Sequence, residues 1–522
     1  MNEKNTLISY NPITDEIVGE VPISRADEIP ILIRNAKRSQ KKWGAMERKQ
    51  QLITLSKLLS ICVSRTDEIC ETICRETGKP FSEALNTEIL ASLTTIDWCI
   101  DWLRRQPNTM EIHQGKLQMM IRYLGRSSYI RYRPLGVVAI ISPFNFPLAI
   151  PFTQAVMSVT AGNAVILKPS SKTPISGHLI ESLFLEAGFP PNLVKVISGP
   201  EIGEALTLSD VDRIIFTGSS ETGRKVMASA SQRLTPVTLE LGGKDAMIVT
   251  EDADLKRAAS GAVWGAFVNS GQVCAAVKRL IVHKDIYSYF LDLVLFETEK
   301  LKQGNSLLDP DVSIGAMIDK EAVQKMEEQV GKAVHEGGRV LIGGSAPKIP
   351  GSFFQPTIIS ELPPKATMWK TETFGPILLV TSYEDDDEAV RLANDSDFAL
   401  TASVWTRNLE RGKRMASSIR AGTVMINNVL YTYGLPATPW GGSGESGFGR
   451  THGQWGMMEL MEPHHIHVDK GNFPHDIWWF PYSSEGLELN RDMINGLFAH
   501  KGVSRLSSLL NVRKGFKDQT RR

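Results

Sequence analysis

The stretch from residue 136 to residue 250 constrains the fold most, because short apolar runs alternate in it with segments of helix length. One of these runs, Val137–Ile141, is apolar at every position, which is typical of a strand buried on both faces of a parallel sheet. Regular alternation of strands and helices predicts a parallel sheet covered by helices, and therefore an α/β fold. The predicted strands are Val137–Ile141, Ala164–Lys168, Leu193–Ile197, Arg213–Thr217, Val237–Glu240 and Ala246–Val249.

The segments on either side of this stretch have patterns of their own. Residues 26–105 are expected to form long amphipathic helices, and Ser128–Pro134 alternates like an exposed strand or arm. A second α/β region is predicted from 251 to about 440. Its helices are expected near 253–270, 285–303, 320–337, 386–394 and 408–420.

The charge balance and the cysteine content narrow the class of protein. The 522 residues include 58 Lys and Arg against 58 Asp and Glu, so the chain lacks the overall positive field that nucleic-acid binding requires. Five cysteines, an odd number, favour a reducing compartment over a disulfide scaffold. The N-terminus has no apolar signal core, and three prolines interrupt the most apolar stretch, Gly136–Phe152. A cytoplasmic location is therefore predicted.

Cys274 differs from the other four cysteines in its surroundings. It lies in FVNSGQVCAA, after Gly271, where the backbone can approach a ligand closely. A single cysteine can equally be a small buried apolar residue, and the other four fit that interpretation because they lie on helical stripes. No histidine or further cysteine completes a metal site with the pair at 70 and 74. These four are Cys62, Cys70, Cys74 and Cys99.

Two polar residues lie beside apolar segments. Glu240 ends a predicted strand and is followed by two glycines, so it is either a salt-bridge or capping residue or a base that activates water or a thiol. Asn145, in SPFNFP, is either a turn-forming residue or an amide that donates to an oxyanion. The sequence pattern alone leaves both alternatives open.

Two segments suggest a phosphate-containing cofactor. Ile214–Gly223, IIFTGSSETG, combines a strand, a glycine and the start of a helix, where backbone N–H groups can bind a pyrophosphate. Ile166–Pro174, ILKPSSKTP, places Lys168 at the carboxyl end of a strand, where open sheets bind ligands.

Taken together, these segments resemble the aldehyde dehydrogenase superfamily over residues 8 to 465. The resemblance implies a Rossmann-like cofactor-binding domain (1–125 and 135–250) and an α/β catalytic domain (251–445). It also implies a β-arm (126–134 and 460–475) that is exchanged between the subunits of a homodimer or homotetramer. The matching segments, in order, are SPFNFP, GNAVILKPS, FTGSSETG, LELGGK, FVNSGQVCAA, ETFGPI and PWGGSGESGFGR.

The family resemblance implies an NAD(P)-dependent oxidation of an aldehyde to a carboxylic acid. Cys274 resembles the nucleophile that forms a thiohemiacetal with the aldehyde, and its N–H and the Asn145 side chain would hold the oxyanion. Hydride transfer to the nicotinamide leaves a thioester, and Glu240 would activate the water that hydrolyses it. A CoA-acylating member often lacks that carboxylate, and an inactive member would not need all three residues, so both alternatives are less favoured. No metal ion is implied.

The resemblance also assigns residues that bind NAD or NADP. Lys168 matches a ribose ligand, Gly218, Ser219 and Gly223 a pyrophosphate turn, and Glu372 a nicotinamide-ribose ligand. Ser171 stands where NAD-preferring members often carry a glutamate that repels a 2′-phosphate, which predicts that NADP is tolerated. Gly444 stands where many members have lysine, which weakens any assignment to a subfamily. The full implied set is Phe144, Lys168, Ser171, Gly218, Ser219, Gly223, Glu372 and Phe374.

The implied substrate tunnel is apolar and aromatic, which favours a hydrophobic aliphatic or aromatic aldehyde. A semialdehyde such as succinic semialdehyde is the alternative. The tyrosines in the set can also be ordinary loop packing. The residues are Phe146, Val273, Ala275, Tyr431, Tyr433 and Leu435.

The C-terminal tail, 476–522, is aromatic at its start and basic at its end. From His500 to Arg522 there are seven Lys or Arg and one Asp, so this part carries 7 − 1 = +6 charges. An amphipathic helix that lies on an anionic membrane surface fits this pattern. A helix packed on a sister subunit, with a solvated basic end, fits it as well. The apolar residues at helical spacing are Leu487, Met493, Ile494, Leu497, Phe498, Val503, Leu506, Leu509 and Leu510, preceded by Trp478 and Trp479.

Overall fold

In the computed structural model the chain forms two compact units. The first unit contains the residues up to Arg105 together with Pro134–Met461, and the second contains Gln106–Arg133 and the residues from Glu462 on. Most of the predicted basic end, namely Lys501, Arg505, Arg513, Lys517, Arg521 and Arg522, lies outside the described residues, as do Val503, Leu506 and Leu509. The structure describes residues 6–106, 109–363, 365–473, 476, 478–498, 507–508, 510–512 and 514–515.

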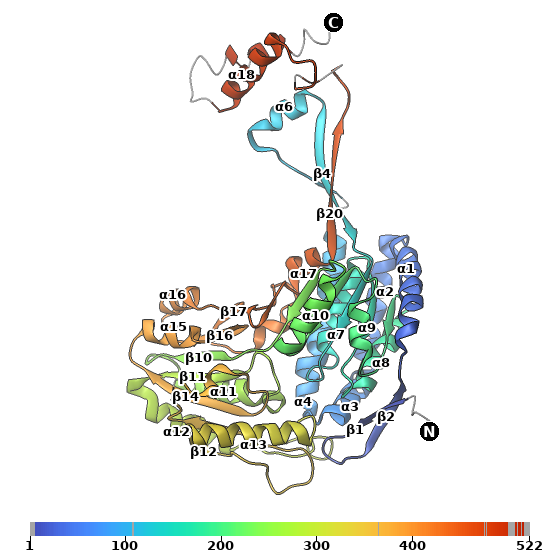
Figure 1. Cartoon of the computed structure of the whole chain (residues 1–522). Helices are drawn as coiled ribbons and strands as arrows, with labels where there is room; N and C mark the ends of the chain where they lie inside the picture. Colours follow the sequence, from blue (N-terminus) through green and yellow to red (C-terminus); the bar gives the residue numbers. More distant parts are fainter. Residues whose placement is uncertain are drawn as a thin grey trace. The chain divides into compact units, whose positions relative to one another are not determined.

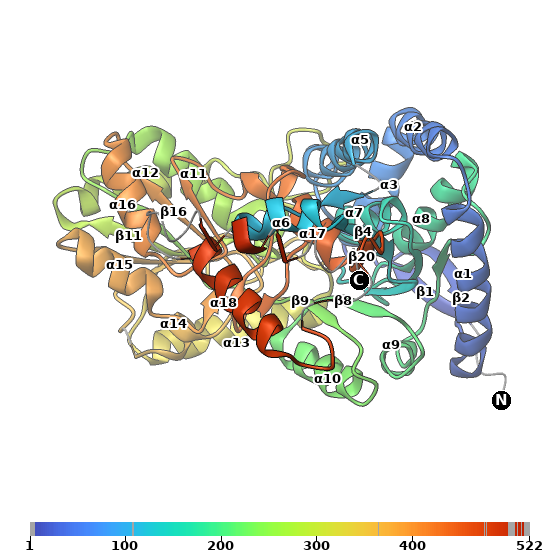
Figure 2. The ribbon, with the colours of Figure 1, turned by 90° about the horizontal axis from the view of Figure 1, so that it is seen from above.

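The first unit contains a six-stranded sheet in the order β19-β9-β8-β5-β6-β7, in which only β19 is antiparallel to its neighbour. Five of the predicted strands are thereby confirmed, although β7 is shorter than expected. Helices pack on this sheet, as α7 does on β5 and β6. Helices α2 and α5 lie side by side in the same part of the unit (Figure 2). The strands are β5 (Val137–Ile141), β6 (Ala164–Lys168), β7 (Val194–Val196), β8 (Arg213–Thr217), β9 (Val237–Glu240) and β19 (Gly447–Phe448).

The helices around this sheet include those predicted before residue 105. Two strands, β1 (Thr6–Tyr10) and β2 (Ile17–Pro22), form a separate hairpin. A π-helical turn, Ala84–Ile89, joins α4 (Phe81–Glu83) to α5. The longer helices are α1 (Ile29–Gly44), α2 (Arg48–Ser64), α3 (Thr66–Thr77), α5 (Leu90–Arg105), α7 (Ala149–Thr160), α8 (Pro174–Ala187), α9 (Ile202–Thr207), α10 (Ser220–Ser231) and α17 (Gly453–Glu459).

A seven-stranded sheet, in the order β12-β13-β14-β11-β10-β16-β17, forms the other part of the first unit (Figure 1). All its pairings are parallel except that of β12 with β13. The five predicted helices of this region are confirmed: the one at 386–394 has the predicted bounds, and the other four are shorter than predicted. The elements are β10 (Asp245–Val249), β11 (Val277–His283), β12 (Arg339–Ile342), β13 (Thr357–Ser360), β14 (Ile377–Tyr383), β16 (Thr401–Trp405), β17 (Thr423–Ile426), α11 (Leu255–Phe267), α12 (Tyr287–Glu299), α13 (Lys320–His335), α14 (Thr367–Lys370), α15 (Asp386–Asn394) and α16 (Leu409–Ser418), with a small ladder of β15 (Phe398–Ala399) and β18 (Ser443–Gly444).

The placement of Ala246–Val249 in the same sheet as the preceding strands was wrong, because β10 pairs with β11 and β16. The chain changes sheets at Gly242 and Gly243. A Cβ at Gly242 would lie 2.3 Å from a Glu372 carboxylate oxygen, and one at Gly243 would lie 2.3 Å from the carbonyl oxygen of Cys274. The contact with the Cys274 backbone therefore requires a glycine at Gly243. An apolar run suits either parallel sheet equally well, so its pattern could not identify its partners.

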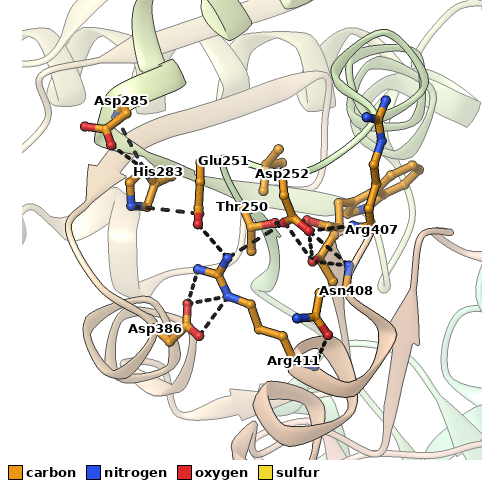
Figure 3. A network of polar contacts seen from close by, with 12 residues as sticks. Thr250, Glu251, Asp252, His283, Asp285, Asp386, Arg407, Asn408 and Arg411 are labelled. Atoms are coloured by element: carbon orange, nitrogen blue, oxygen red, sulfur yellow. Dashed lines mark hydrogen bonds and ion pairs between the residues drawn. The ribbon is translucent and has the colours of Figure 1, made fainter.

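The two sheets present opposite ends to each other. The carboxyl ends of β5, β6, β8 and β9 lie towards the segments that precede β10, β11 and β14. At the carboxyl ends of the strands in the seven-stranded sheet, Arg411 instead forms a network of ion pairs and hydrogen bonds with acidic side chains (Figure 3). Arg411 of α16 contacts Asp386 of α15 at 2.6 Å and Glu251, after β10, at 2.7 Å. Asp252 accepts bonds from the backbone N–H of Arg407 and of its successor, which ties β10 to the end of β16.

The second unit is built on a three-stranded sheet in the order β20-β4-β3. The side chain of Arg126 forms salt bridges with Asp469 and Asp476. A small core joins Leu124 of this unit to Leu489 and Val512. None of its described helices, nor any other helix in the described part of the chain, is long and apolar enough to cross a membrane. Its elements are β3 (Met110–Glu111), α6 (Gln118–Tyr123), β4 (Arg126–Pro134), β20 (Met461–Asp469) and α18 (Ser484–Phe498).

Candidate active site

A cleft of about 800 Å³ lies between the two sheets of the first unit. Segments that follow β5, β6 and β8 form one wall, and segments that precede β10, β11 and β14 form the other. Ser171, Gly223, Glu240 and the six predicted substrate residues are not among the residues that line it. Eight of the predicted site residues line it together: Phe144, Asn145, Lys168, Gly218, Ser219, Cys274, Glu372 and Phe374.

A strained loop after α11 turns Cys274 into this cleft. Asn269 and Ser270 both have a φ of 53°, in the left-handed region that costs free energy for a residue with a side chain. Gly271 has a φ of 70°, and a Cβ there would lie 2.1 Å from the carbonyl oxygen of Gly375. The glycine that marked this segment in the sequence is therefore required by a close backbone approach.

The Cys274 thiol is held in its protonated form in this surrounding. Burial raises the pKa of the thiol to about 12, against the opposing charge of the Lys278 ammonium. The carboxylates of Asp245, Glu240 and Glu372 raise the pKa of the thiol as well. Because the thiolate is the nucleophilic form, the thiol must transfer its proton to a base before it can attack a substrate.

The Asn145 side chain has a fixed orientation. Its Nδ2 donates a hydrogen bond to the carbonyl oxygen of Gln272, two residues before Cys274, at 2.8 Å. A carbonyl oxygen only accepts, so the amide cannot be turned the other way, and the second N–H of Nδ2 remains for a ligand. The Asn145 Oδ1 is buried and has no hydrogen-bond partner among the described residues.

The Glu240 carboxyl group is buried, and Glu240 does not line the cleft, although its neighbour Leu241 does. The Glu240 Oε1 has no hydrogen-bond partner among the described residues. Burial raises the pKa of this carboxyl well above its usual range, while the charge of Arg450 and a hydrogen bond with Trp440 act in the opposite direction. A carboxylate with a raised pKa is a stronger proton acceptor than an ordinary glutamate.

The cofactor end of the cleft contains a helix N-terminus. Ser219 is the N-cap of α10, and its side chain accepts a hydrogen bond from the backbone N–H of Thr222 at 3.3 Å. A Cβ at Gly218 would lie 2.6 Å from the Phe216 ring, so a glycine is required there. Gly223 packs against Leu241 and not into the cleft. These residues leave the first N–H groups of α10 near the cleft, where they can bind an anion.

Among the described residues, three lysines line the cleft, Lys168, Lys225 and Lys325, and a fourth, Lys278, is buried next to Glu372. Lys168 ends β6 and lines the cleft, and burial lowers the pKa of its ammonium. Ser170 lines the cleft, whereas Ser171 does not. Lys278 lies behind Glu372: its Nζ is 3.2 Å from Glu372 Oε1 and 3.3 Å from the carbonyl oxygen of Cys274. Lys278 was not predicted from the sequence, although a lysine at the start of a buried strand and four residues after Cys274 was a usable signal.

An apolar cluster adjoins Cys274 away from the cofactor end. It brings together four of the six predicted substrate residues with Trp440 and Leu400, which were not predicted from the sequence. The Tyr433 ring lies edge-on to the Trp440 ring, with the centres of the two rings 5.1 Å apart. Tyr431 is 59% exposed and, like Leu435, is not part of this cluster. The four residues are Phe146, Val273, Ala275 and Tyr433.

Comparison with known proteins identifies the family of this chain. The aldehyde dehydrogenase family matches residues 1–466. A 4,4'-diapolycopene aldehyde oxidase of Methylomonas sp is 35% identical over 500 residues, covering 95% of this chain and 92% of that protein. A succinate-semialdehyde dehydrogenase (NADP+) of Escherichia coli (strain K12) is 34% identical and covers 87% of this chain and 92% of that protein. The crystal structure of an NAD-dependent aldehyde dehydrogenase from Sinorhizobium meliloti has a TM-score of 0.85 at 31% identity, covering 91% and 93% of the two chains. The chain therefore belongs to the aldehyde dehydrogenase family and is an oxidoreductase that acts on the aldehyde group with NAD or NADP.

Proposed function

We propose that this protein oxidises a hydrophobic aldehyde to its carboxylic acid through a thioester on Cys274. The observation that carries the proposal is the position of Cys274, which lines the cleft and also packs against the apolar cluster. An aldehyde with an apolar tail can place its carbonyl carbon at the thiol while the tail contacts Phe146 and Trp440. We assign 135–250, with 1–125, to cofactor binding and 251–445 to catalysis.

The residues act in a defined order in this proposal. The Cys274 thiol first releases its proton to solvent, and the thiolate then adds to the carbonyl carbon. The resulting oxyanion is held by the Cys274 N–H and the free Nδ2–H of Asn145. Collapse of the oxyanion expels hydride from the same carbon and leaves a thioester. When bound, NAD or NADP supplies the acceptor for that hydride. Glu240 then removes a proton from water, whose oxygen adds to the thioester carbon. The C–S bond breaks, the acid leaves and the thiolate is restored.

The cleft fits a dinucleotide in its chemistry. The N-terminus of the 12-residue helix α10 supplies backbone N–H groups for a pyrophosphate, and Lys168 supplies a ribose ligand. Glu372 and Phe374, before β14, lie on the opposite wall at the nicotinamide end. The proposal that NADP is accepted rests on Ser171, and the Escherichia coli relative named for NADP+ supports it.

The apolar cluster favours a hydrophobic aldehyde over a semialdehyde. None of its described members carries a cationic side chain that would bind a second carboxylate. The relative named for a 4,4'-diapolycopene aldehyde supports this choice, and the one named for succinate semialdehyde supports the alternative. Reduced-cofactor absorbance with acetaldehyde, decanal, benzaldehyde and succinic semialdehyde separates the two. We expect the highest kcat/KM with decanal or benzaldehyde and no activity in Cys274→Ala. A clear preference for succinic semialdehyde would overturn the substrate assignment.

We propose a homo-oligomer whose second unit meets an anionic membrane surface through exposed apolar side chains. The proposal rests on large apolar side chains from Trp478 onwards that are all exposed: Trp478, Trp479, Phe480, Tyr482, Leu487, Ile494 and Phe498. Tryptophan and tyrosine are enriched at membrane interfaces. Helix α18 carries Glu485, Glu488 and Asp492 against one arginine, so the attraction to anionic lipid must come from the basic end, with its +6 charges. The five cysteines are all free, which suits a reducing, cytoplasmic setting.

Flotation with phosphatidylglycerol vesicles tests the membrane proposal. The full chain is expected to float at low salt, and Trp479→Ser with Phe480→Ser is expected to remain at the bottom of the gradient with its activity unchanged. The matched control is Leu234→Ser, at an exposed apolar residue of the first unit (88% exposed). If the full chain does not float, the membrane proposal is wrong. If, in addition, the double variant has a different oligomer mass in sedimentation, the exposed side chains instead contact a second copy of the chain.

A further inference from the structure

A buried ion pair, which the proposed mechanism does not use, lies next to the Asn145 segment. Lys79 Nζ and Glu88 Oε1 are 2.6 Å apart, and neither side chain is exposed to solvent. Such a pair is weak evidence for stability, because taking two charges out of water costs about as much as their attraction returns. Its contacts therefore need another explanation.

Both members of the pair hold the segment that carries Asn145. Lys79 Nζ donates to the carbonyl oxygen of Asn145 at 2.9 Å and lies 4.2 Å from the centre of the Phe146 ring. Glu88 Oε2 accepts from the backbone N–H groups of Leu148, at 3.1 Å, and Ala149, at 2.7 Å. The pair thus fixes the backbone on both sides of the turn that leads into α7.

The same region of the chain also reaches the cysteine loop. Glu88 lies in the π-helical turn after α4, a type of turn found often at functional sites. Glu83, just before it, accepts from the backbone N–H of Asn269 at 2.9 Å. Asn269 Nδ2 in turn donates to the carbonyl oxygen of Asn145 at 2.9 Å. The Asn145 carbonyl oxygen therefore has two donors, one from Lys79 and one from the loop that leads to Cys274.

We propose that Lys79 and Glu88 are positioning residues. They fix the backbone at Asn145, so that the free Nδ2–H of the Asn145 side chain points at the oxyanion formed on the substrate bound to Cys274. The inference rests on the oxyanion role proposed for Asn145. Neither residue touches the substrate. Their effect on the rate passes through the direction of one N–H, and a shift of about 1 Å in such a group costs up to about 10²-fold in rate.

The test is a cycle of variants measured in the intact enzyme with the best aldehyde of the panel. Lys79→Met with Glu88→Gln removes both charges together, so no uncompensated buried charge remains. This double variant is expected to lower kcat about 10-fold while KM for the aldehyde and the Kd of NAD change less than about twofold. In an Asn145→Ala background the same double substitution is expected to have no further effect on kcat.

The matched control is Glu76→Gln. Glu76 is equally buried and accepts from the N–H groups of Ile175 and Ser176 at the start of α8, so it has the same kind of contact away from Asn145. In a variant with both Glu76→Gln and Asn145→Ala, the factors by which the two single substitutions lower kcat are expected to multiply, as they do for independent sites.

The positioning role of Lys79 and Glu88 and the oxyanion role of Asn145 can be contradicted separately. If Asn145→Ala lowers kcat and the Lys79 and Glu88 substitutions lower it by the same further factor, the positioning role is wrong. If Asn145→Ala alone leaves kcat unchanged, the oxyanion role itself is wrong, and the positioning role is lost with it. Near-UV circular dichroism of each variant shows that its packing is retained.

Discussion

Lys278 Nζ lies 3.2 Å from Glu372 Oε1 and 3.3 Å from the backbone carbonyl oxygen of Cys274, so one buried ammonium group joins the proposed cofactor and nucleophile residues. The cation lowers the pKa of the Cys274 thiol, against the larger opposing effect of burial. Replacing Lys278 with Met is expected to raise that pKa, because the thiolate loses a nearby positive charge. Alkylation by iodoacetamide at pH 8 should slow about 10-fold for each unit of the shift. A rate equal to that of the native enzyme would contradict this contribution of Lys278.

Glu240→Gln should separate acylation from hydrolysis. Burial raises the pKa of Glu240 well above its usual range, and the water-activating form is the carboxylate. In the native enzyme kcat should therefore rise with pH through that raised pKa if hydrolysis limits the rate. In Glu240→Gln we expect one burst of reduced cofactor per active site in a stopped-flow trace, followed by a steady rate lower by about 10²-fold or more. Steady turnover at the native rate would exclude Glu240 as the base.

Ser171→Glu should select against NADP. A carboxylate at this position is expected to repel the 2′-phosphate of NADP and leave NAD nearly unaffected. The kcat/KM ratio of NADP to NAD should fall by about 10-fold or more, a loss of ~1.4 kcal/mol in relative transition-state stabilisation. Ser171→Gln, which has nearly the same shape without the charge, is the control and should change the ratio much less. Equal ratios in the two variants would show that charge at residue 171 does not decide the preference.

Arg411→Met should reduce stability without affecting catalysis. The guanidinium group contacts Asp386 and Glu251 at the carboxyl ends of the seven-stranded sheet, away from the ends that carry Cys274. Loss of these charged hydrogen bonds should lower the free energy of unfolding by about 2 kcal/mol in urea titrations. The kcat of the native enzyme should be retained, and a large loss of kcat would show that this network reaches the active site.

The stabilisation through Arg411 should also depend on pH in one direction. A hydrogen bond with Arg411 lowers the pKa of the Glu251 carboxyl. A carboxyl whose pKa is lower in the folded state stabilises the fold above its unfolded pKa of about 4.3. This contribution is lost as the pH falls through the lower, folded value. The difference in unfolding free energy between the native chain and Arg411→Met should therefore be full at pH 7 and shrink below about pH 4.

The sequence predicted the parts of the fold and site that depend on local pattern. The strands Val137–Ile141 and Arg213–Thr217 have apolar runs bounded by turns, so their existence could be predicted from nearby residues alone. The lining of the cleft by Cys274 and Asn145 followed from segments that resemble a known family. The sheet to which β10 belongs could not be predicted, because a fully apolar run fits either sheet.

Contacts between distant segments could not be predicted from pattern. Lys79 and Asn145 are 66 positions apart, and a single sequence contains no signal that joins them. In the sequence, Lys79 is an ordinary lysine between the glycine and proline that end a helix. Tyr431 and Tyr433 are a further example, because two tyrosines in one short turn point to different surroundings: one is exposed and the other joins the apolar cluster.

The opposed ends of the two sheets have a mechanical consequence. The proposed base, Glu240, and oxyanion donor, Asn145, belong to the six-stranded layer, whereas the thiol of Cys274 belongs to the seven-stranded layer. Neither layer holds a complete catalytic set. A slide of one layer over the other would change the distances from the Cys274 thiol to Asn145 and to Glu240 together, whereas the distance between Asn145 and Glu240 would stay the same. Turnover therefore requires the two layers to keep their relative position, and the chain passes from one layer to the other at Gly242 and Gly243, close against Glu372 and the Cys274 carbonyl oxygen.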